Sequence, residues 1–226
     1  ASASSHCFWR EMRPANRRPS LPLGWFDLCV IPQHDKPPAR TNVLATRGVL
    51  NTARPSAERE ADTGLFLIGG PSKHHGWDTH GLLAQIDAIL AATPGMRWTL
   101  TTSRRTPAET EAALLTLRER GVDVRPVADT PPGWAMAQVA RSAQAWVTED
   151  SVSMVYESLT AGAATGLLAV PRLGETRITA GVAQLQQEGF VTPFAGWQRE
   201  GRLHTPPTPL READRVADAV LSRWPQ

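Results

Sequence analysis

A short segment with several anion-binding groups follows the first strongly apolar run of the chain. The run "LFLI" leads into two glycines, a serine, a lysine and two histidines. Glycines let a backbone approach a ligand closely, and hydroxyl, ammonium and imidazole groups donate hydrogen bonds to phosphate oxygens. The groups in question are Gly69, Gly70, Ser72, Lys73 and His74. The segment predicts a phosphate cradle, and the alternative is a plain Gly-Pro turn with polar side chains.

Spacing argues against two familiar phosphate loops and against a metal site in this segment. The patterns GxxxxGK[ST] and GxGxxG are both absent here. His74 and His75 are adjacent and cannot easily point the same way, and Asp78 and His80 complete no compact ligand set. We therefore expect no metal ion, and we keep His74 as a candidate general base.

A second segment, "TTSRRTP" (101–107), places two arginines ahead of a well-marked helix start. Cations at a helix N-terminus oppose the helix dipole unless an anion neutralises them. A bound anionic ligand would do this, and so would a protein carboxylate. We favour the ligand, and we assign Ser103, Arg104 and Arg105 to its binding.

The third segment, "TEDSVSMVYESLTAG" (148–162), is the most specific of the three. Asp150, Ser151 and Ser153 crowd one helix start, although a helix needs only one N-cap, which Asp150 or Ser151 would supply. The remaining donors could hold a diphosphate. Glu157 lies four residues after Ser153 on the same helix face, where its carboxylate could accept hydrogen bonds from sugar hydroxyls. A solvated helix residue is the alternative for Glu157.

Alternating apolar strands and amphipathic helices must position these three segments. Strands are predicted at 65–70, 97–103, 122–127, 145–149, 166–170 and 190–192, and helices at 80–92, 106–121, 133–143, 150–162, 176–188 and 210–224. The pattern predicts an α/β fold, a Rossmann-like parallel sheet with helices on both faces. Ligands bind at the carboxyl ends of such strands, where all three segments fall.

The first part of the chain is less regular. Two short strands at 25–32 and 42–46 precede a polar stretch at 47–64. We therefore predict a domain boundary after residue 61, with a less regular region over residues 1–61 and a regular α/β domain over residues 62–226. The loop after the first strand contains His34, a second candidate general base.

Composition narrows the class of protein. The 226 residues are 41% hydrophobic with a net charge of +2, which is typical of a globular protein and too small an excess to indicate nucleic-acid binding. Cys7 and Cys29 lack metal-ligand spacing, which favours a reduced, cytoplasmic protein. No apolar run approaches the roughly 18 residues that a transmembrane helix needs.

Five phrases occur in one order: "WFDLCVIPQHD", "NVLATRG", "LIGGPSKHHGWD", "TTSRRTP" and "VTEDSVSMVYESLTAG". Together they resemble the Elongated-Mitochondria (Elm-like) fission-protein family, whose bacterial members often carry the label nucleoside-diphosphate-sugar epimerase. The resemblance covers roughly residues 25 to 200. It implies a GT-B architecture, which has two Rossmann-like domains with a nucleotide-sugar site. On that resemblance, residues 1–61 would be a partial N-terminal Rossmann-like region, and residues 62–226 would be the C-terminal nucleotide-sugar-binding domain. Ser72, Ser151, Ser153 and Glu157 match the positions that hold the donor nucleotide in that architecture.

Two departures from the family pattern bear on activity. We expect the family's N-terminal part, with its glycine-containing loop, to lie before residue 1. Ala163, Ala164 and Thr165 stand where such folds often carry a Lys/Arg-Pro turn. The first hypothesis is nevertheless a nucleotide-sugar-binding protein that transfers a glycosyl group, with no tightly bound cofactor.

Two alternatives remain open. A non-catalytic adaptor would act through protein partners, with Trp9, Trp77, Trp134 and Trp197 as candidate exposed contacts. An NAD-dependent sugar epimerase ranks third, because such enzymes need a Tyr-x-x-x-Lys pair. Tyr156, the single tyrosine, is followed four positions later by Thr160.

Overall fold

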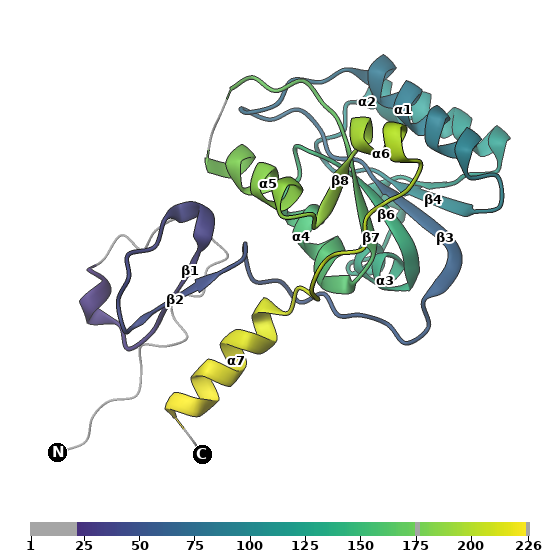
Figure 1. Cartoon of the computed structure of the whole chain (residues 1–226). Coiled ribbons are helices and arrows are strands. Elements are labelled where there is room, and N and C mark those ends of the chain that lie inside the picture. Colours follow the sequence, from purple (N-terminus) through teal and green to yellow (C-terminus); the bar gives the residue numbers. More distant parts are fainter. Residues whose placement is uncertain (1–21, 175–176, 225–226) are drawn as a thin grey trace. The chain divides into compact units, whose positions relative to one another are not determined.

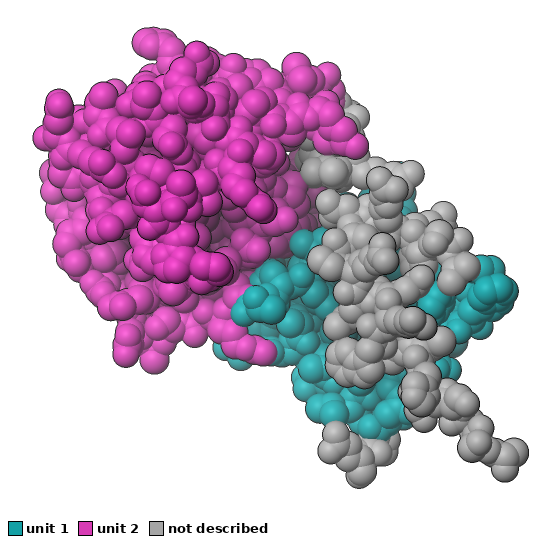
Figure 2. Space-filling view, turned by 180° about the vertical axis from the view of Figure 1, so that it is seen from behind, with its two compact units in different colours: residues 1–52, 210–226 teal, residues 53–209 magenta. Residues whose placement is uncertain are grey.

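The computed structural model describes residues 22–174 and 177–224, and these form two compact units (Figures 1 and 2). Unit 1 comprises residues 1–52 and 210–226, and unit 2 comprises residues 53–209. The sequence placed a single boundary between residues 61 and 62, whereas the chain divides at 52/53 and again at 209/210. The last helix therefore belongs to the same unit as the first strands.

Unit 2 is built on one six-stranded parallel sheet in the order β5-β4-β3-β6-β7-β8. The strands are β3 (Glu60–Leu67), β4 (Arg97–Thr101), β5 (Asp123–Arg125), β6 (Ser142–Thr148), β7 (Ala164–Leu168) and β8 (Val191–Pro193). The chain builds outward from β3 to β5 and then returns to place β6 on the other side of β3. The order reverses between β3 and β6, and ligands bind at such a switch point in open α/β sheets.

Helices cover both faces of this sheet, as predicted (Figure 1). They are α1 (Thr79–Ala92), α2 (Ala108–Leu115), α3 (Trp134–Arg141), α4 (Val152–Ala161), α5 (Arg177–Gln187) and α6 (Phe194–Glu200). Helices α1, α2 and α6 bury apolar side chains against one face, in a cluster that includes Phe66, Ile86, Leu114 and Trp197. Helices α3, α4 and α5 lie on the other face. The predicted Rossmann-like fold is confirmed.

Large aromatic rings lie across glycines of neighbouring strands in the core. The Trp146 ring is fully buried and covers Gly166 of β7, while the Trp98 ring of β4 covers Gly64 of β3. Trp197 of α6 meets Trp146 edge to face, with ring centroids 5.4 Å apart. Trp197 is therefore a core residue, and its assignment as an exposed partner contact is wrong.

The sequence analysis missed the first half of strand β3, which is polar, and the whole of helix α6. Strand β3 begins at Glu60 rather than within the apolar run, because Arg97 pairs with Glu60 and Asp62 beside it. Helix α6 lies in "PFAGWQRE", where Pro193 and Gly196 hide the helical pattern. Helix α2 also ends early, and the 3-10 helix η3 (Thr116–Arg120) continues to the predicted stop at Gly121.

Unit 1 contains the two predicted short strands, which pair in parallel. Its elements are η1 (Leu23–Trp25), β1 (Cys29–Pro32), η2 (Gln33–Asp35), β2 (Val43–Thr46) and α7 (Glu212–Arg223). Arginines of α7 attach the helix to this unit: Arg223 donates to the carbonyls of Asp27 and Thr41, and Arg215 donates to that of Ala45. These contacts explain why the chain end joins unit 1.

Among the described residues, no helix combines the length and the apolar character that crossing a membrane requires.

Filling the space under Trp146 should destabilise unit 2. In Gly166→Ala the new Cβ would lie 2.4 Å from the Trp146 ring, a distance that forces a buried side chain to move. We expect a loss of about 1–3 kcal/mol in the free energy of unfolding, measured by urea denaturation. Gly95→Ala is the matched control, because nothing lies within 4 Å of its Cβ, and it should change stability by less than about 0.5 kcal/mol. Equal effects of the two substitutions would contradict this packing.

Candidate functional site

The strand order brings the three predicted binding segments to one edge of the unit 2 sheet. Strands β4, β3 and β6 are neighbours and all run in the same direction. Their carboxyl ends therefore lie side by side, and they lead into residues 68–76, 102–107 and 149–151. The site is formed by these three loops at the β3/β6 switch point.

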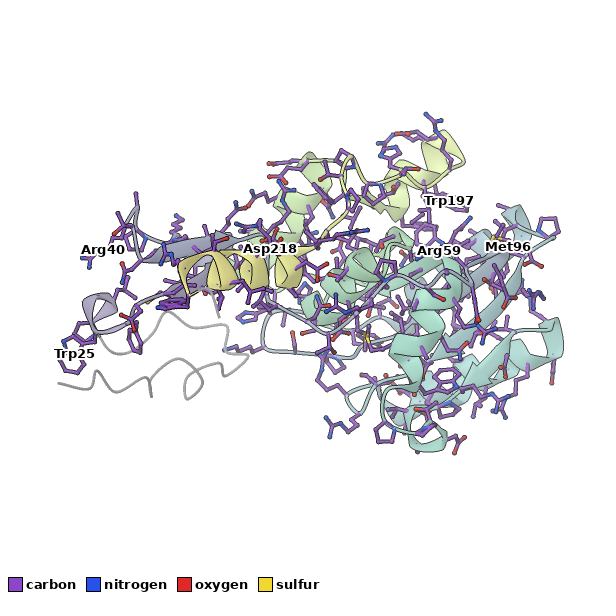
Figure 3. The ribbon with its side chains drawn as sticks, turned by 90° about the horizontal axis from the view of Figure 1, so that it is seen from below. Trp25, Arg40, Arg59, Met96, Trp197 and Asp218 are labelled. Carbon is purple, nitrogen blue, oxygen red and sulfur yellow. The ribbon has the colours of Figure 1, made fainter. Side chains whose placement is uncertain are left out.

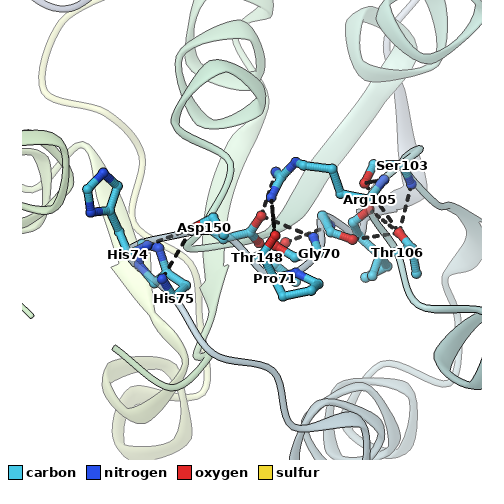
Figure 4. A network of polar contacts seen from close by, with 12 residues as sticks. Gly70, Pro71, His74, His75, Ser103, Arg105, Thr106, Thr148 and Asp150 are labelled. Atoms are coloured by element: carbon cyan, nitrogen blue, oxygen red, sulfur yellow. Dashed lines mark hydrogen bonds and ion pairs between the residues drawn. The ribbon is translucent and has the colours of Figure 1, made fainter. Parts of the chain in front are cut away.

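A buried carboxylate joins the three loops. The side chain of Asp150 is 0% exposed. Its Oδ2 accepts hydrogen bonds from the Gly70 N–H at 3.1 Å and from Arg105 Nη2 at 2.7 Å (Figure 4). Its Oδ1 has no hydrogen-bond partner among the described residues. Gly69 is needed beside it, because a Cβ there would lie 2.3 Å from the carboxylate.

The Arg105 guanidinium binds the loop after β3 and the loop after β6 at the same time. Besides the Asp150 ion pair, its Nη1 donates to the carbonyls of Gly70 at 2.6 Å and Pro71 at 3.2 Å. The protein therefore supplies the anion that the sequence analysis expected from a ligand or a carboxylate. The Arg105 side chain is still 43% exposed, so this held cation also faces solvent.

Two threonines also connect these loops: Thr148 at the end of β6 and Thr106 in the loop after β4. Gly69 N–H donates to Thr148 Oγ1 at 2.8 Å, and Thr106 Oγ1 donates to the Gly69 carbonyl at 2.5 Å. Ser103 binds within its own turn, where its N–H donates to Thr106 Oγ1 and its Oγ accepts from the Arg105 N–H. Sequence reasoning missed Thr106 and Thr148 as site residues. Thr106 opens a predicted helix and Thr148 lies near the end of a predicted strand, and these places were the available signal.

The loop after β3 offers fewer donors than a phosphate cradle needs. The N–H groups of Gly69 and Gly70 are bound inside the protein, as described above. The Ser72 hydroxyl accepts from the N–H groups of His74 and His75, at 3.2 and 3.1 Å. Lys73 is exposed and makes no ion pair with other described residues. The glycines and Ser72 thus shape this loop, and Lys73 is its free donor.

His75 fastens this loop to the one after β7. It forms an isolated antiparallel bridge with Arg172, and Leu173 N–H donates to the His74 carbonyl at 2.9 Å. Arg172 in turn pairs with the buried carboxylate of Glu149 at 2.9 Å. Burial lowers the pKa of His75, so its imidazole is neutral at neutral pH. His74, the candidate base, is half-buried.

No group of three or more His, Cys, Asp or Glu side chains within residues 22–174 and 177–224 is arranged to hold a metal ion.

The start of α4 contrasts with the loop after β3. Ser151 is the N-cap by backbone position, but its hydroxyl makes no capping hydrogen bond, although the residue is 9% exposed. Ser153, two positions further along, is exposed. Asp150 does not cap the helix, because its carboxylate turns toward Gly70 and Arg105. The first N–H groups of α4 and two hydroxyls are therefore available to an anion.

Glu157 lies one turn further along α4. It is half-buried and forms no hydrogen bond or ion pair with the residues that the structure describes. Burial raises the pKa of the Glu157 carboxyl. A half-buried carboxylate without a partner costs stability, and such groups concentrate at functional sites. The structure thus argues against the solvated-residue alternative for Glu157.

The remaining candidates are dispersed. Arg104 is exposed and makes no ion pair with another described residue. His34 belongs to unit 1, in the turn after β1, where burial lowers its pKa. Its neighbour Asp35 is 7% exposed, and its Oδ2 has no hydrogen-bond partner within the part of the chain that the structure describes. Lys36 adopts a left-handed backbone with φ of 50°. Sequence reasoning missed this strained turn.

Comparison with known families identifies the chain. The profile described as mitochondrial fission ELM1 matches residues 15–224. The chain belongs to the mitochondrial fission ELM1 family. This confirms the resemblance that the five sequence phrases carried.

Other comparisons add little to the ELM1 family assignment. No curated protein matches the chain significantly. A solved structure from Listeria monocytogenes, named for UDP-N-acetylglucosamine 2-epimerase, is similar at 10% identity with a TM-score of 0.49. The match covers 73% of this chain and 46% of that chain.

The raised pKa of Glu157 in this ELM1 family member predicts that its effect on folding stability depends on pH. Because its pKa is raised in the folded state, Glu157 favours folding below its unfolded pKa of about 4.3, and this contribution is lost as pH rises through the folded pKa. Glu157→Gln should therefore raise the thermal midpoint at about pH 7 and change it little at about pH 4.

The control for this measurement is Glu58→Gln. Glu58 is exposed and its side chain makes no ion pair with the described residues, so its substitution should shift the midpoint at neither pH. A lower midpoint for Glu157→Gln at neutral pH would mean that Glu157 has a stabilising partner.

Proposed function

We propose that unit 2 binds a nucleoside-diphosphate sugar at the start of α4 and that the protein transfers the glycosyl group. The observation that carries this proposal is Glu157, a half-buried carboxylate with a raised pKa and no partner among the described residues. It lies one turn beyond a helix start whose hydroxyls are uncommitted. Carboxylate and helix start together suit a ligand with hydroxyls at one end and anions at the other.

The diphosphate would take the helix start. The α4 N–H groups carry partial positive charge, and the hydroxyls of Ser151 and Ser153 add two donors. Lys73, Arg104 and Arg105 supply cations from the adjacent loops. These groups neutralise a diphosphate without requiring a metal ion.

The ribose would take Glu157. Four residues separate it from Ser153, which corresponds to about 6 Å along a helix. An ionised carboxylate accepts a hydrogen bond from each of two vicinal hydroxyls, the pattern that the ribose of a nucleotide presents. The nucleoside then lies along α4, and the phosphates lie toward the β3/β6 switch point.

The cations and helix N–H groups near the diphosphate would favour glycosyl transfer. When an acceptor oxygen attacks the anomeric carbon, the bond from that carbon to the phosphate oxygen breaks, and its electron pair leaves with the nucleoside diphosphate. Fixed cations and helix N–H groups stabilise that leaving charge. The acceptor proton needs a base, for which His74 is the candidate within unit 2.

A second candidate function, a non-catalytic adaptor, is favoured by apolar exposure in unit 1. Trp25 is 70% exposed on η1 (Figure 3), and Leu221 and Trp224 of α7 are 55% and 43% exposed. Exposed tryptophans are common at protein interfaces. These exposed residues replace the candidates Trp77, Trp134 and Trp197: Trp77 and Trp134 are partly buried, and Trp197 is in the core. Trp9 lies outside the described residues.

Nucleotide binding tests the leading proposal. Titration calorimetry with UDP, GDP and ADP should detect binding of at least one below about 1 mM. Glu157→Ala and Ser153→Ala should each weaken it about tenfold or more, because each removes a charged or helix-start hydrogen bond. Glu58→Ala is the control. Absence of binding to all three nucleotides by the folded protein would refute the proposal. Loss of partner capture in Trp25→Ala with unaltered nucleotide affinity would instead favour the adaptor.

A further inference from the structure

The Asp150–Arg105 pair has features that a purely structural ion pair lacks. Asp150 is wholly buried, whereas the guanidinium that it holds remains 43% exposed at the carboxyl edge of the sheet. The head of Arg105 is fixed by three acceptors, namely Asp150 and the carbonyls of Gly70 and Pro71. A long, flexible side chain has thereby lost its freedom before any ligand arrives. Pre-ordering of this kind favours binding, because the entropy of ordering is already spent.

The Arg105 guanidinium lies near the start of α4 because the residue that binds it comes just before that helix. Asp150 directly precedes Ser151, the N-cap of α4, so the guanidinium bound to Asp150 lies next to the helix start. Glu157 lies further along the same helix, six positions after Ser151. A nucleotide whose ribose meets Glu157 would place its first phosphate at the helix start. Its second phosphate would then reach Arg105.

We propose that Asp150 is a positioning residue that holds Arg105 to read the second phosphate, so that the site selects nucleoside diphosphates over monophosphates. This inference rests on the proposed function. In this proposal Asp150 does not contact the ligand. Gly69 leaves room for the Asp150 carboxylate, and Gly70 leaves room for the Arg105 backbone. A Cβ on Gly70 would lie 2.1 Å from the Arg105 carbonyl oxygen, which shows how closely these loops meet.

Geometry also explains why a lysine would not serve. The guanidinium reaches Asp150 through Nη2 and two carbonyls through Nη1, a planar fork that an ammonium cannot reproduce. Arg105→Lys keeps the charge but loses the fixed direction. The variant therefore separates a held cation from a merely nearby one.

The test compares affinities for a nucleoside diphosphate and its monophosphate by calorimetry, using whichever of UDP/UMP, GDP/GMP or ADP/AMP binds the full chain. Asp150→Asn keeps an acceptor for the Gly70 N–H but removes the charge that holds Arg105. We expect Asp150→Asn, Arg105→Gln and Arg105→Lys each to weaken diphosphate binding about tenfold while monophosphate affinity changes less than about twofold. A general loss of structure would weaken both ligands alike.

Coupling between the two residues gives the second measurement. If Asp150 acts through Arg105, the double variant Asp150→Asn/Arg105→Gln should bind the diphosphate no more weakly than Arg105→Gln alone. The matched controls are Asp87→Asn and Arg120→Gln, which break an exposed ion pair between α1 and η3. They should leave both affinities unchanged.

Each result has a distinct meaning. Additive losses in the double variant, full diphosphate affinity in Arg105→Lys, or equal losses for both ligands would overturn the inference while the nucleotide site stands. Failure of the unaltered chain to bind any of the six nucleotides would overturn the proposed function, and the inference with it.

Discussion

The carboxyl edge of unit 2 depends on the burial of a single negative charge. Placing a carboxylate in a protein interior is costly unless it is paired and hydrogen-bonded. Asp150 meets this condition with the Arg105 guanidinium and the Gly70 N–H, and both partners come from other loops. The Asp150 carboxylate, in the loop after β6, therefore fixes the positions of the loops after β3 and β4. Gly69 and Gly70 follow from the same constraint, since only a glycine leaves room for the carboxylate and for the Arg105 backbone.

Two acidic residues at this site illustrate opposite solutions to burial. Asp150 is fully enclosed and paired, and removing one member of such a pair leaves an uncompensated charge. Glu157 is half-buried, has a raised pKa and lacks a partner among the described residues. The paired Asp150 stabilises the loops, whereas the half-buried Glu157 carboxylate is unfavourable for folding when it is ionised. That contrast gives Asp150 a structural role, and it is the basis on which we propose ligand contact for Glu157.

Sequence patterns predicted the sheet well because they report short-range periodicity. The apolar strands and most helices of unit 2 were found within a few residues, and the strand order then placed the three binding segments together. The partners of Asp150 were not predictable in this way, because Gly70 lies 80 positions and Arg105 lies 45 positions away in the chain. A loop rich in glycine and serine looks like a cradle until those distant acceptors are known. Trp197 was misjudged for the same reason, since only the fold brings it to Trp146.

The division of the chain into units has a consequence for how the molecule is made. Strands β1 and β2 leave the ribosome early, but α7, which completes their unit, is synthesised after the whole of residues 53–209. At usual rates of translation this delay is roughly ten to thirty seconds. Unit 2 is a contiguous segment and can fold while the chain is still growing. Unit 1 must wait until α7 is made, because Arg215 and Arg223 of that helix bind the carbonyls of Ala45 and Thr41.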